Sequence, residues 1–207
     1  MAMRSLWHSR RAPWALAAAV LVLSGLAWWG AATWRTAPPP VVVADMETDF
    51  CVVAPPTPYD PALGLPLTAA RTVPTAARCP VCGMYPARSL DWAGQIIFSN
   101  GDAQFFDSPV SLLMFLNDVP RYSAGRSADD IVARYVTDVT SKEWIDAGAA
   151  FYVYGSNALG PMRAGNLPAF AARSAAEDFA QRRGGEVRAL GAIDAAMLQS
   201  MSTQHQH

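Results

Sequence analysis

Hydrophobic residues are spread unevenly along the chain, and their pattern predicts an anchor, a linker and a folded body. Residues 14–34 form an apolar run without a charged side chain, longer than the roughly 20 residues that a helix needs to cross a bilayer core. Prolines then interrupt the chain, and neither helical nor strand periodicity persists, which predicts an extended linker. We therefore divide the sequence into a short N-terminus (1–13), a transmembrane anchor (14–34), a proline-rich linker (35–78), a folded domain (79–190) and a C-terminal tail (191–207).

The first half of the folded domain carries strong local signals. The apolar stretches GQIIFS (94–99) and AQFF (103–106) flank Asn100-Gly101, which predicts a β-hairpin with a tight turn. Ser108 followed by Pro109 is typical of a helix N-terminus, since serine caps a helix and proline suits its first position. The apolar residues after it predict a helix that ends near Asn117.

The second half alternates strands and helices. Ser174 and Glu177 have the spacing of a capping box, which predicts a helix that Gly184-Gly185 ends. The remaining expected elements are strands at 131–139, 149–156, 166–172 and 186–190 and a weak helix at 191–201.

Two parts of the domain have a similar pattern. GDAQFFDSPVSLLMFL and GNLPAFAARSAAEDFA each read as a strand that ends in Phe, a short break, a serine and an apolar helix. The fold class is therefore α+β, with two small related β-β-α units at about 79–122 and 123–190.

Charge and composition exclude some function classes. The formal net charge is −1, so there is no basic surplus for binding nucleic acid. The histidines are His8, His205 and His207, so the body has none. This excludes a Ser-His-Asp hydrolase, and any metal site in the body must be built without imidazole.

The charges around the apolar run predict its orientation. Arg4, Arg10 and Arg11 precede it, and acidic residues follow it, so the positive-inside rule places the N-terminus in the cytoplasm and the domain in the periplasm. We expect a single-pass protein of the cytoplasmic membrane. A cleaved signal peptide with the small residues 30–32 as its cleavage site is the alternative.

The stretch RCPVCGMY (78–85) contains two of the three cysteines of the chain and a methionine. A Cys-x-x-Cys pair by itself is compatible with a disulfide, a thioredoxin-like redox motif or half of a zinc site. The sequence lacks a second such pair, and proline-rich sequence rather than a β-α-β unit precedes the motif. A structural disulfide here would close a very short loop and gain little loop entropy.

The residues after the pair favour a soft metal. Cys82 and Met84 place a thiolate and a thioether on either side of Gly83, which lets the chain bend tightly. Thiolate and thioether sulfur are the ligands that Cu(I) prefers. Cys79 can add a second thiolate, or it can pair with Cys82 in a disulfide that blocks the site.

These residues resemble a known family. CPVCGM, GQIIFSNGDAQFFDSPVSLLMFL, VTDVTSKEWIDAGAAFYVYGSNALGPM and AFAARSAAEDFAQRRGGEV are similar, in this order, to motifs of the NosL family, the copper accessory proteins of nitrous oxide reductase assembly. The resemblance covers roughly residues 79–190. It implies two related α+β units and a membrane-tethered periplasmic protein that binds one Cu(I) ion.

The resemblance also implies site residues and partners. Family members bind copper through the Cys and Met of the C-x-M core, here Cys82 and Met84, and some add a histidine that this chain lacks. We place Cys79 in the vacant position and take Met162, in GPMRAG, as a further candidate ligand. The implied partners are a copper enzyme, with nitrous oxide reductase as the first candidate, and other copper-assembly factors.

The leading hypothesis is a non-catalytic Cu(I) metallochaperone. The rival is an enzyme, a membrane-anchored thiol–disulfide reductase that keeps a client's copper ligands reduced. Asp107 and Asp138, which follow strands, are expected to be turn or cap residues. Cys51 and the tail residues Met201, His205 and His207 are left without an assigned role.

Overall fold

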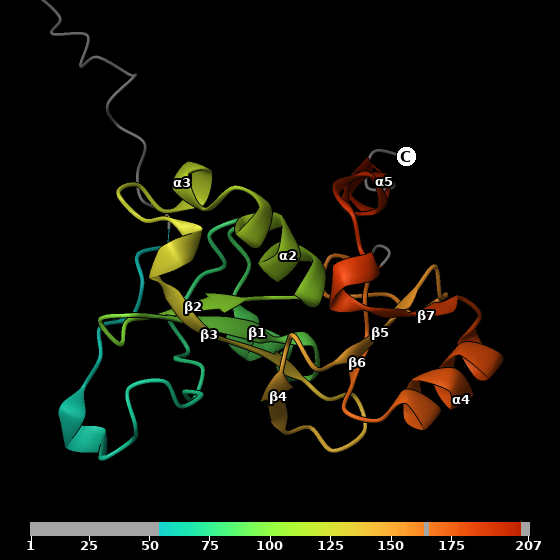
Figure 1. Cartoon of the computed structure of the whole chain (residues 1–207), viewed down its shortest axis with the longest axis horizontal. Helices are drawn as coiled ribbons and strands as arrows, with labels where there is room; N and C mark the ends of the chain where they lie inside the picture. Colours follow the sequence, from blue (N-terminus) through green and yellow to red (C-terminus); the bar gives the residue numbers. More distant parts are fainter. Residues whose placement is uncertain (1–53, 164–165, 204–207) are drawn as a thin grey trace, which may run out of the picture. The chain divides into compact units, whose positions relative to one another are not determined.

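A computed structural model describes residues 54–163 and 166–203 of the chain (Figure 1). The expected anchor at 14–34, Cys51, His205 and His207 lie outside the described residues. Within the described part, none of the helices combines the length and the apolar character that crossing a membrane requires.

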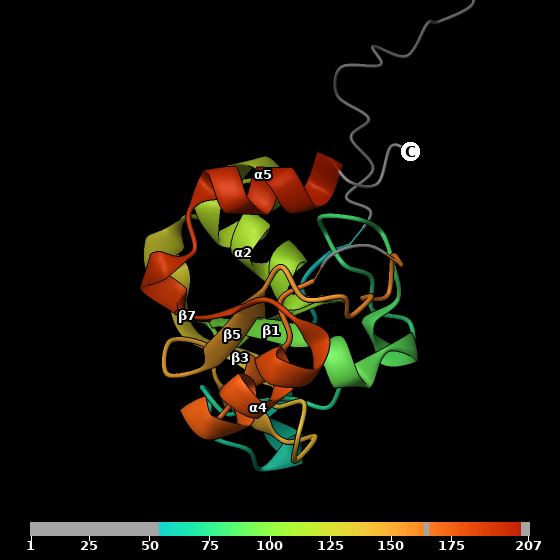
Figure 2. The ribbon, with the colours of Figure 1, turned by 90° about the vertical axis from the view of Figure 1, so that its right-hand side faces the viewer.

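Two antiparallel sheets and their helices make up the described body, which is a mixed α+β fold as expected (Figures 1 and 2). The first sheet has the strand order β2-β1-β3-β4, and the second has the order β6-β5-β7. The strands are β1 (Gly94–Phe98), β2 (Ala103–Phe106), β3 (Ile131–Thr137), β4 (Trp144–Asp146), β5 (Phe151–Tyr154), β6 (Ala169–Phe170) and β7 (Glu186–Ala189). The α-helices are α2 (Pro109–Asn117), α3 (Val119–Tyr122), α4 (Arg173–Arg183) and α5 (Ala195–Thr203), and short 3₁₀ turns occupy Pro61–Leu63, Pro86–Arg88, Leu90–Trp92, Ala128–Asp130 and Leu190–Ala192.

The two sheets repeat one arrangement. In the first, the hairpin β1–β2 leads into α2, and β3 returns to pair with β1. In the second, β5 pairs with β6, α4 follows, and β7 returns to pair with β5. The repeating unit is therefore β-β-α-β. β3 and β4 belong to the first sheet, so the first unit extends at least to Asp146. The boundary between the two units therefore lies later in the chain than the expected position between residues 122 and 123.

The first hairpin forms where the local signals predict it. Gly94 pairs with Phe106 and Ile97 with Ala103, on either side of the expected Asn-Gly turn. Gly101 has a φ of 87°, and a Cβ there would come within 2.8 Å of the Tyr59 ring. Both the backbone conformation and the space therefore require glycine.

The two serines expected as helix caps behave differently. Ser108 caps α2, its side chain accepting a hydrogen bond from Ser111 N at 3.3 Å, with Pro109 in the first position. The expected capping box of α4 is wrong, because the helix begins two residues earlier than that box implies, at Arg173, with Ala172 instead of Ser174 as its N-cap. Ser174 therefore lies inside the first turn, and Glu177 faces Arg173 as an i,i+4 ion pair at 3.4 Å.

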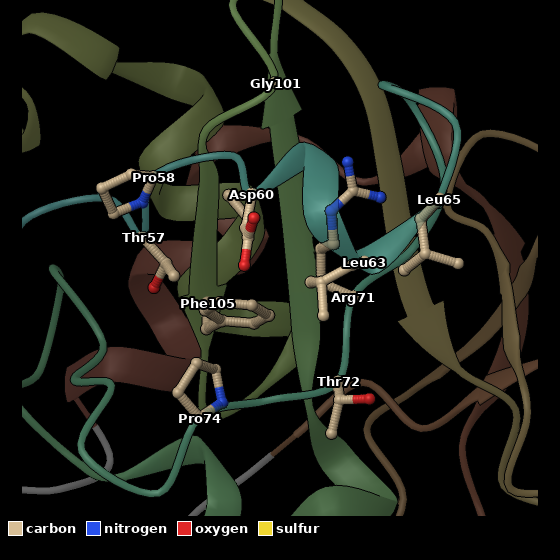
Figure 3. Close-up of a pocket in the computed structure, with 11 residues that line it drawn as sticks. Thr57, Pro58, Asp60, Leu63, Leu65, Arg71, Thr72, Pro74, Gly101 and Phe105 are labelled. Atoms are coloured by element: carbon tan, nitrogen blue, oxygen red, sulfur yellow. The ribbon is translucent and has the colours of Figure 1, made fainter.

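The proline-rich stretch is not an extended linker from Ala54 onward, because it packs against the first sheet. Thr57 forms a two-way backbone bridge with Ala103 of β2. The buried Gln95 side chain accepts a hydrogen bond from Arg71 N at 2.7 Å and donates one to Arg71 O at 2.9 Å. A cavity of about 290 Å³ remains between this segment and the hairpin, with Phe105 and Arg71 in its wall (Figure 3).

Asp138 joins the two sheets at the end of β3. It forms an isolated parallel bridge with Ala169 of β6. Its carboxylate accepts hydrogen bonds from Ser141 Oγ at 2.8 Å, Thr140 N at 3.2 Å and Ala171 N at 3.4 Å. Burial opposes ionisation of this carboxyl, but these hydrogen bonds outweigh it and lower the pKa of Asp138. The expectation of a turn residue is confirmed for Asp138.

We expect Asp138→Ala to lower the free energy of unfolding by about 2–3 kcal/mol at neutral pH, because hydrogen bonds to a buried charged group are lost. Since the pKa is lowered in the folded state, this contribution is present above the unfolded carboxyl value of about 3.9 and is lost as the pH falls through the folded value. Urea unfolding at pH 7 and at acid pH measures the difference. Asp178→Ala, on an exposed position of α4, is the control. An equal loss at both pH values would contradict the role of the ionised carboxylate.

Candidate metal centre

The cysteine motif folds into a closed loop between residues 79 and 84. Cys79 N donates to Met84 O at 2.8 Å, and Gly83 N donates to Cys79 O at 2.8 Å. Gly83 has a φ of 73°, in the left-handed region that favours glycine. These two hydrogen bonds bring both cysteines to the same side of one turn, and the tight bend expected at Gly83 is confirmed.

Three potential ligand groups meet at this loop. Single atoms of Cys79, Cys82 and Asp107 all lie within 4.8 Å of one another. Cys82 Sγ donates to Asp107 Oδ1 at 3.1 Å, and Ser111 Oγ lies 4.0 Å from the same sulfur. Both cysteines are free thiols. The turn of residues 79–84 is thus placed against the junction of β2 and α2, where Asp107 directly precedes the cap Ser108.

The centre is buried on one side and open on the other. Cys79 is fully buried and Asp107 is 1% exposed, whereas Cys82 is half-buried and Met84 is 37% exposed. Asp107 Oδ2 is buried and has no hydrogen-bond partner among the described residues. A buried carboxylate oxygen without a partner is costly unless something else satisfies it, and a bound cation would do so.

The two thiols differ in their tendency to ionise. Burial opposes ionisation of Cys79, but the polar neighbours Cys82 and Asp107, including their backbone N–H groups, together lower the pKa of Cys79. The interaction with Cys79, followed by burial and the negative charges of Cys79 and Asp107, raises the pKa of Cys82. Without a cation, therefore, one negative charge on sulfur is favoured over two.

Comparison with known proteins identifies the family. The family model described as NosL matches residues 70–198, which is more than half of the chain. This chain belongs to the NosL family. The resemblance of the sequence motifs to that family is thereby confirmed.

A solved NosL structure has a related fold. The crystal structure of the copper chaperone NosL from Shewanella denitrificans aligns with a TM-score of 0.53 and 24% identity, covering 63% of this chain and 99% of that protein. The likeness supports the α+β architecture. No curated protein sequence matches this chain.

The site residues expected from the sequence have different outcomes. Cys79 and Cys82 lie side by side, and Met84 lies on the same turn. Met162 is 46% exposed on the loop between β5 and β6, and its assignment as a ligand stays a prediction. The expectation for Asp107 missed its main contact, which is with Cys82. The only local signal at Asp107 is its place before a helix cap, and that signal indicates a turn.

Proposed function

We propose that this NosL-family chain is a Cu(I) metallochaperone that binds one Cu(I) ion at the turn of residues 79–84. The observation that carries the proposal is the adjacent pair of free thiols in a closed turn with an exposed methionine on its rim. Two thiolates and a thioether form a soft donor set that suits Cu(I). The related structure, described as a copper chaperone, supports the same role.

Solvent exposure increases from Cys79 to Cys82 to Met84, and this suits transfer of the copper ion rather than its storage. Cys79 is enclosed, so its sulfur retains the ion, whereas Cys82 and Met84 face progressively more solvent. The thioether of Met84 is uncharged and is the weakest of the three donors. A ligand from an acceptor protein can therefore replace Met84 first and withdraw the ion from the open side.

The proposal extends to location and client. The apolar run at 14–34, with arginines before it, supports a cytoplasmic-membrane anchor that holds the domain in the periplasm. Membership of the NosL family supports a copper enzyme as the acceptor, with nitrous oxide reductase as the first candidate, together with other copper-assembly factors. In this role the chain is a carrier and not an enzyme.

A thiol–disulfide reductase is the second candidate. The adjacent free thiols of Cys79 and Cys82 favour it, because such a pair can reduce a client's disulfide. Thiol exchange does not need a thioether, so Met84 separates the two functions.

We expect Met84→Leu to weaken Cu(I) binding about tenfold or more, the scale on which lost support of a metal site lowers affinity. Leucine keeps the size and apolar character of the side chain but offers no donor. The measurement is competition for Cu(I) with a chromophoric chelator under anaerobic reducing conditions. Met114→Leu, at a half-buried position on α2, is the control and should leave the affinity unchanged. Unchanged copper affinity in Met84→Leu, with thiol exchange intact, would favour the reductase.

A further inference from the structure

Two arginines stack on one tyrosine beside the metal centre. The guanidinium carbons of Arg78 and Arg88 lie 4.3 Å and 4.6 Å from the centroid of the Tyr85 ring. Arg78 also donates to Gly83 O at 3.3 Å and to the Tyr85 hydroxyl. Arg78 directly precedes Cys79, and Tyr85 directly follows Met84, so this cluster borders the open side of the centre.

Neither arginine of this cluster forms an ion pair with a described carboxylate. The four ion pairs of the described residues use Arg126, Lys142, Arg173 and Arg188, and none of them includes Arg78 or Arg88. The Arg88 backbone N donates to Tyr85 O at 3.0 Å, but its guanidinium forms no hydrogen bond to another described residue. The distances to the shared ring place the two guanidinium carbons at most about 9 Å apart, within one Debye length at 0.1 M salt. Their charges therefore repel each other, and an added carboxylate would relieve that repulsion.

Stacking on Tyr85 and a short turn support this cluster. Tyr85 is the N-cap of the 3₁₀ turn Pro86–Arg88, whose Pro86 is buried. Arg78 and Arg88 are both exposed on this support, next to the exposed Met84. A guanidinium group fixed by stacking offers its remaining N–H donors as a fork that matches a carboxylate.

We propose that Arg78, Tyr85 and Arg88 form a docking surface for the acidic rim of an acceptor protein. This inference rests on the proposed function, because the surface matters only if Cu(I) leaves through the open side at Met84. Carboxylates bound to the two arginines would place the acceptor's own copper ligands over Met84. A protein fits better than a lipid surface, since a bilayer pressed on this patch would cover the exit and supply no copper ligand.

The test uses the full chain, loaded with Cu(I), and two synthetic acceptor peptides. Both peptides carry the same pair of cysteines, flanked by aspartates in one and by asparagines in the other. At low ionic strength we expect transfer to the aspartate peptide to be about tenfold faster, as electrostatic steering predicts, and the preference to shrink as salt is added. The double variant Arg78→Gln/Arg88→Gln should lose the preference. Arg173→Gln/Arg182→Gln, on α4, removes the same charge elsewhere and should retain it.

The outcomes separate this inference from the proposed function. Failure of the wild-type chain to hold Cu(I) against the competing chelator overturns the proposed function, and the docking surface with it. If the chain binds Cu(I) but transfers it to both peptides at the same rate, the docking surface alone is overturned. The same holds if the double variant still transfers Cu(I) faster to the aspartate peptide. If the double variant changes transfer only in phosphatidylglycerol bilayers, and equally for both peptides, the surface faces lipid and the inference is wrong.

Discussion

Replacing Cys82 by serine is expected to abolish tight Cu(I) binding, with a loss of affinity of more than about 100-fold. Loss of a group that merely supports a ligand already costs roughly 10–100-fold, and Cys82 is itself the central ligand of the proposed site. It contacts Asp107, neighbours Cys79 and precedes Met84 by two residues, so its sulfur lies at the middle of the proposed donor set. Competition with a chromophoric Cu(I) chelator measures the loss.

Two further cysteine variants make this result specific. Cys79→Ser should also weaken Cu(I) binding, because its sulfur lies in the same cluster. Cys51→Ser removes the one cysteine of the sequence that lies outside the motif. It is the matched control, and we expect it to bind Cu(I) like the wild-type chain. If Cys79→Ser left the affinity unchanged, the assignment of Cys79 as a ligand would be wrong. If Cys82→Ser left the Cu(I) affinity unchanged, the assignment of the copper site to the turn of residues 79–84 would be wrong.

Phe115→Ala is expected to lower the free energy of unfolding by about 3–5 kcal/mol, the usual cost of removing a fully buried aromatic side chain. Phe115 is 0% exposed on α2, and its ring lies 5.1 Å from that of Phe106 and 5.9 Å from that of Tyr122. These contacts hold α2 against the end of β2, which is where Asp107 and Ser108 are placed. Chemical denaturation followed by circular dichroism measures the loss.

Phe115→Leu is the matched variant. It keeps most of the buried apolar volume, so we expect a clearly smaller loss than for alanine. The position of α2 also connects this core to the metal centre, so Phe115→Ala should weaken Cu(I) binding at temperatures where the chain is still folded. A loss of stability below about 1 kcal/mol for alanine would contradict the packing of α2 on the hairpin.

Local chemistry explains which elements the sequence predicts well. The hairpin turn at Asn100-Gly101 and the cap at Ser108 depend on residues within a few positions of each other, and both occur as expected. The capping box at Ser174 fails because the same spacing fits a serine inside the first turn, where Glu177 pairs with Arg173 instead. Sequence spacing alone does not distinguish the two arrangements.

Contacts between distant segments explain what the sequence does not reveal. The docking of the proline-rich stretch depends on Gln95, a polar residue inside a strand, which binds the backbone of Arg71. Strand β4 has only three residues, half-buried or exposed, and shows no clear alternation. For the candidate metal centre, the spacing in the sequence predicts Cys79, Cys82 and Met84 as ligands, and this assignment stays a prediction. Asp107 is added only by the packing of the hairpin end against the loop.

The most direct test of the central claim is a competition titration of the full chain, anaerobic and fully reduced, with Cu(I) in the presence of a chromophoric chelator. We predict that one Cu(I) per chain is withheld from the chelator and that the withheld fraction falls in Cys82→Ser and Met84→Leu. If the wild-type chain withheld no Cu(I), or if both variants withheld as much as the wild type, the assignment of a sulfur copper site to the turn of residues 79–84 would be contradicted.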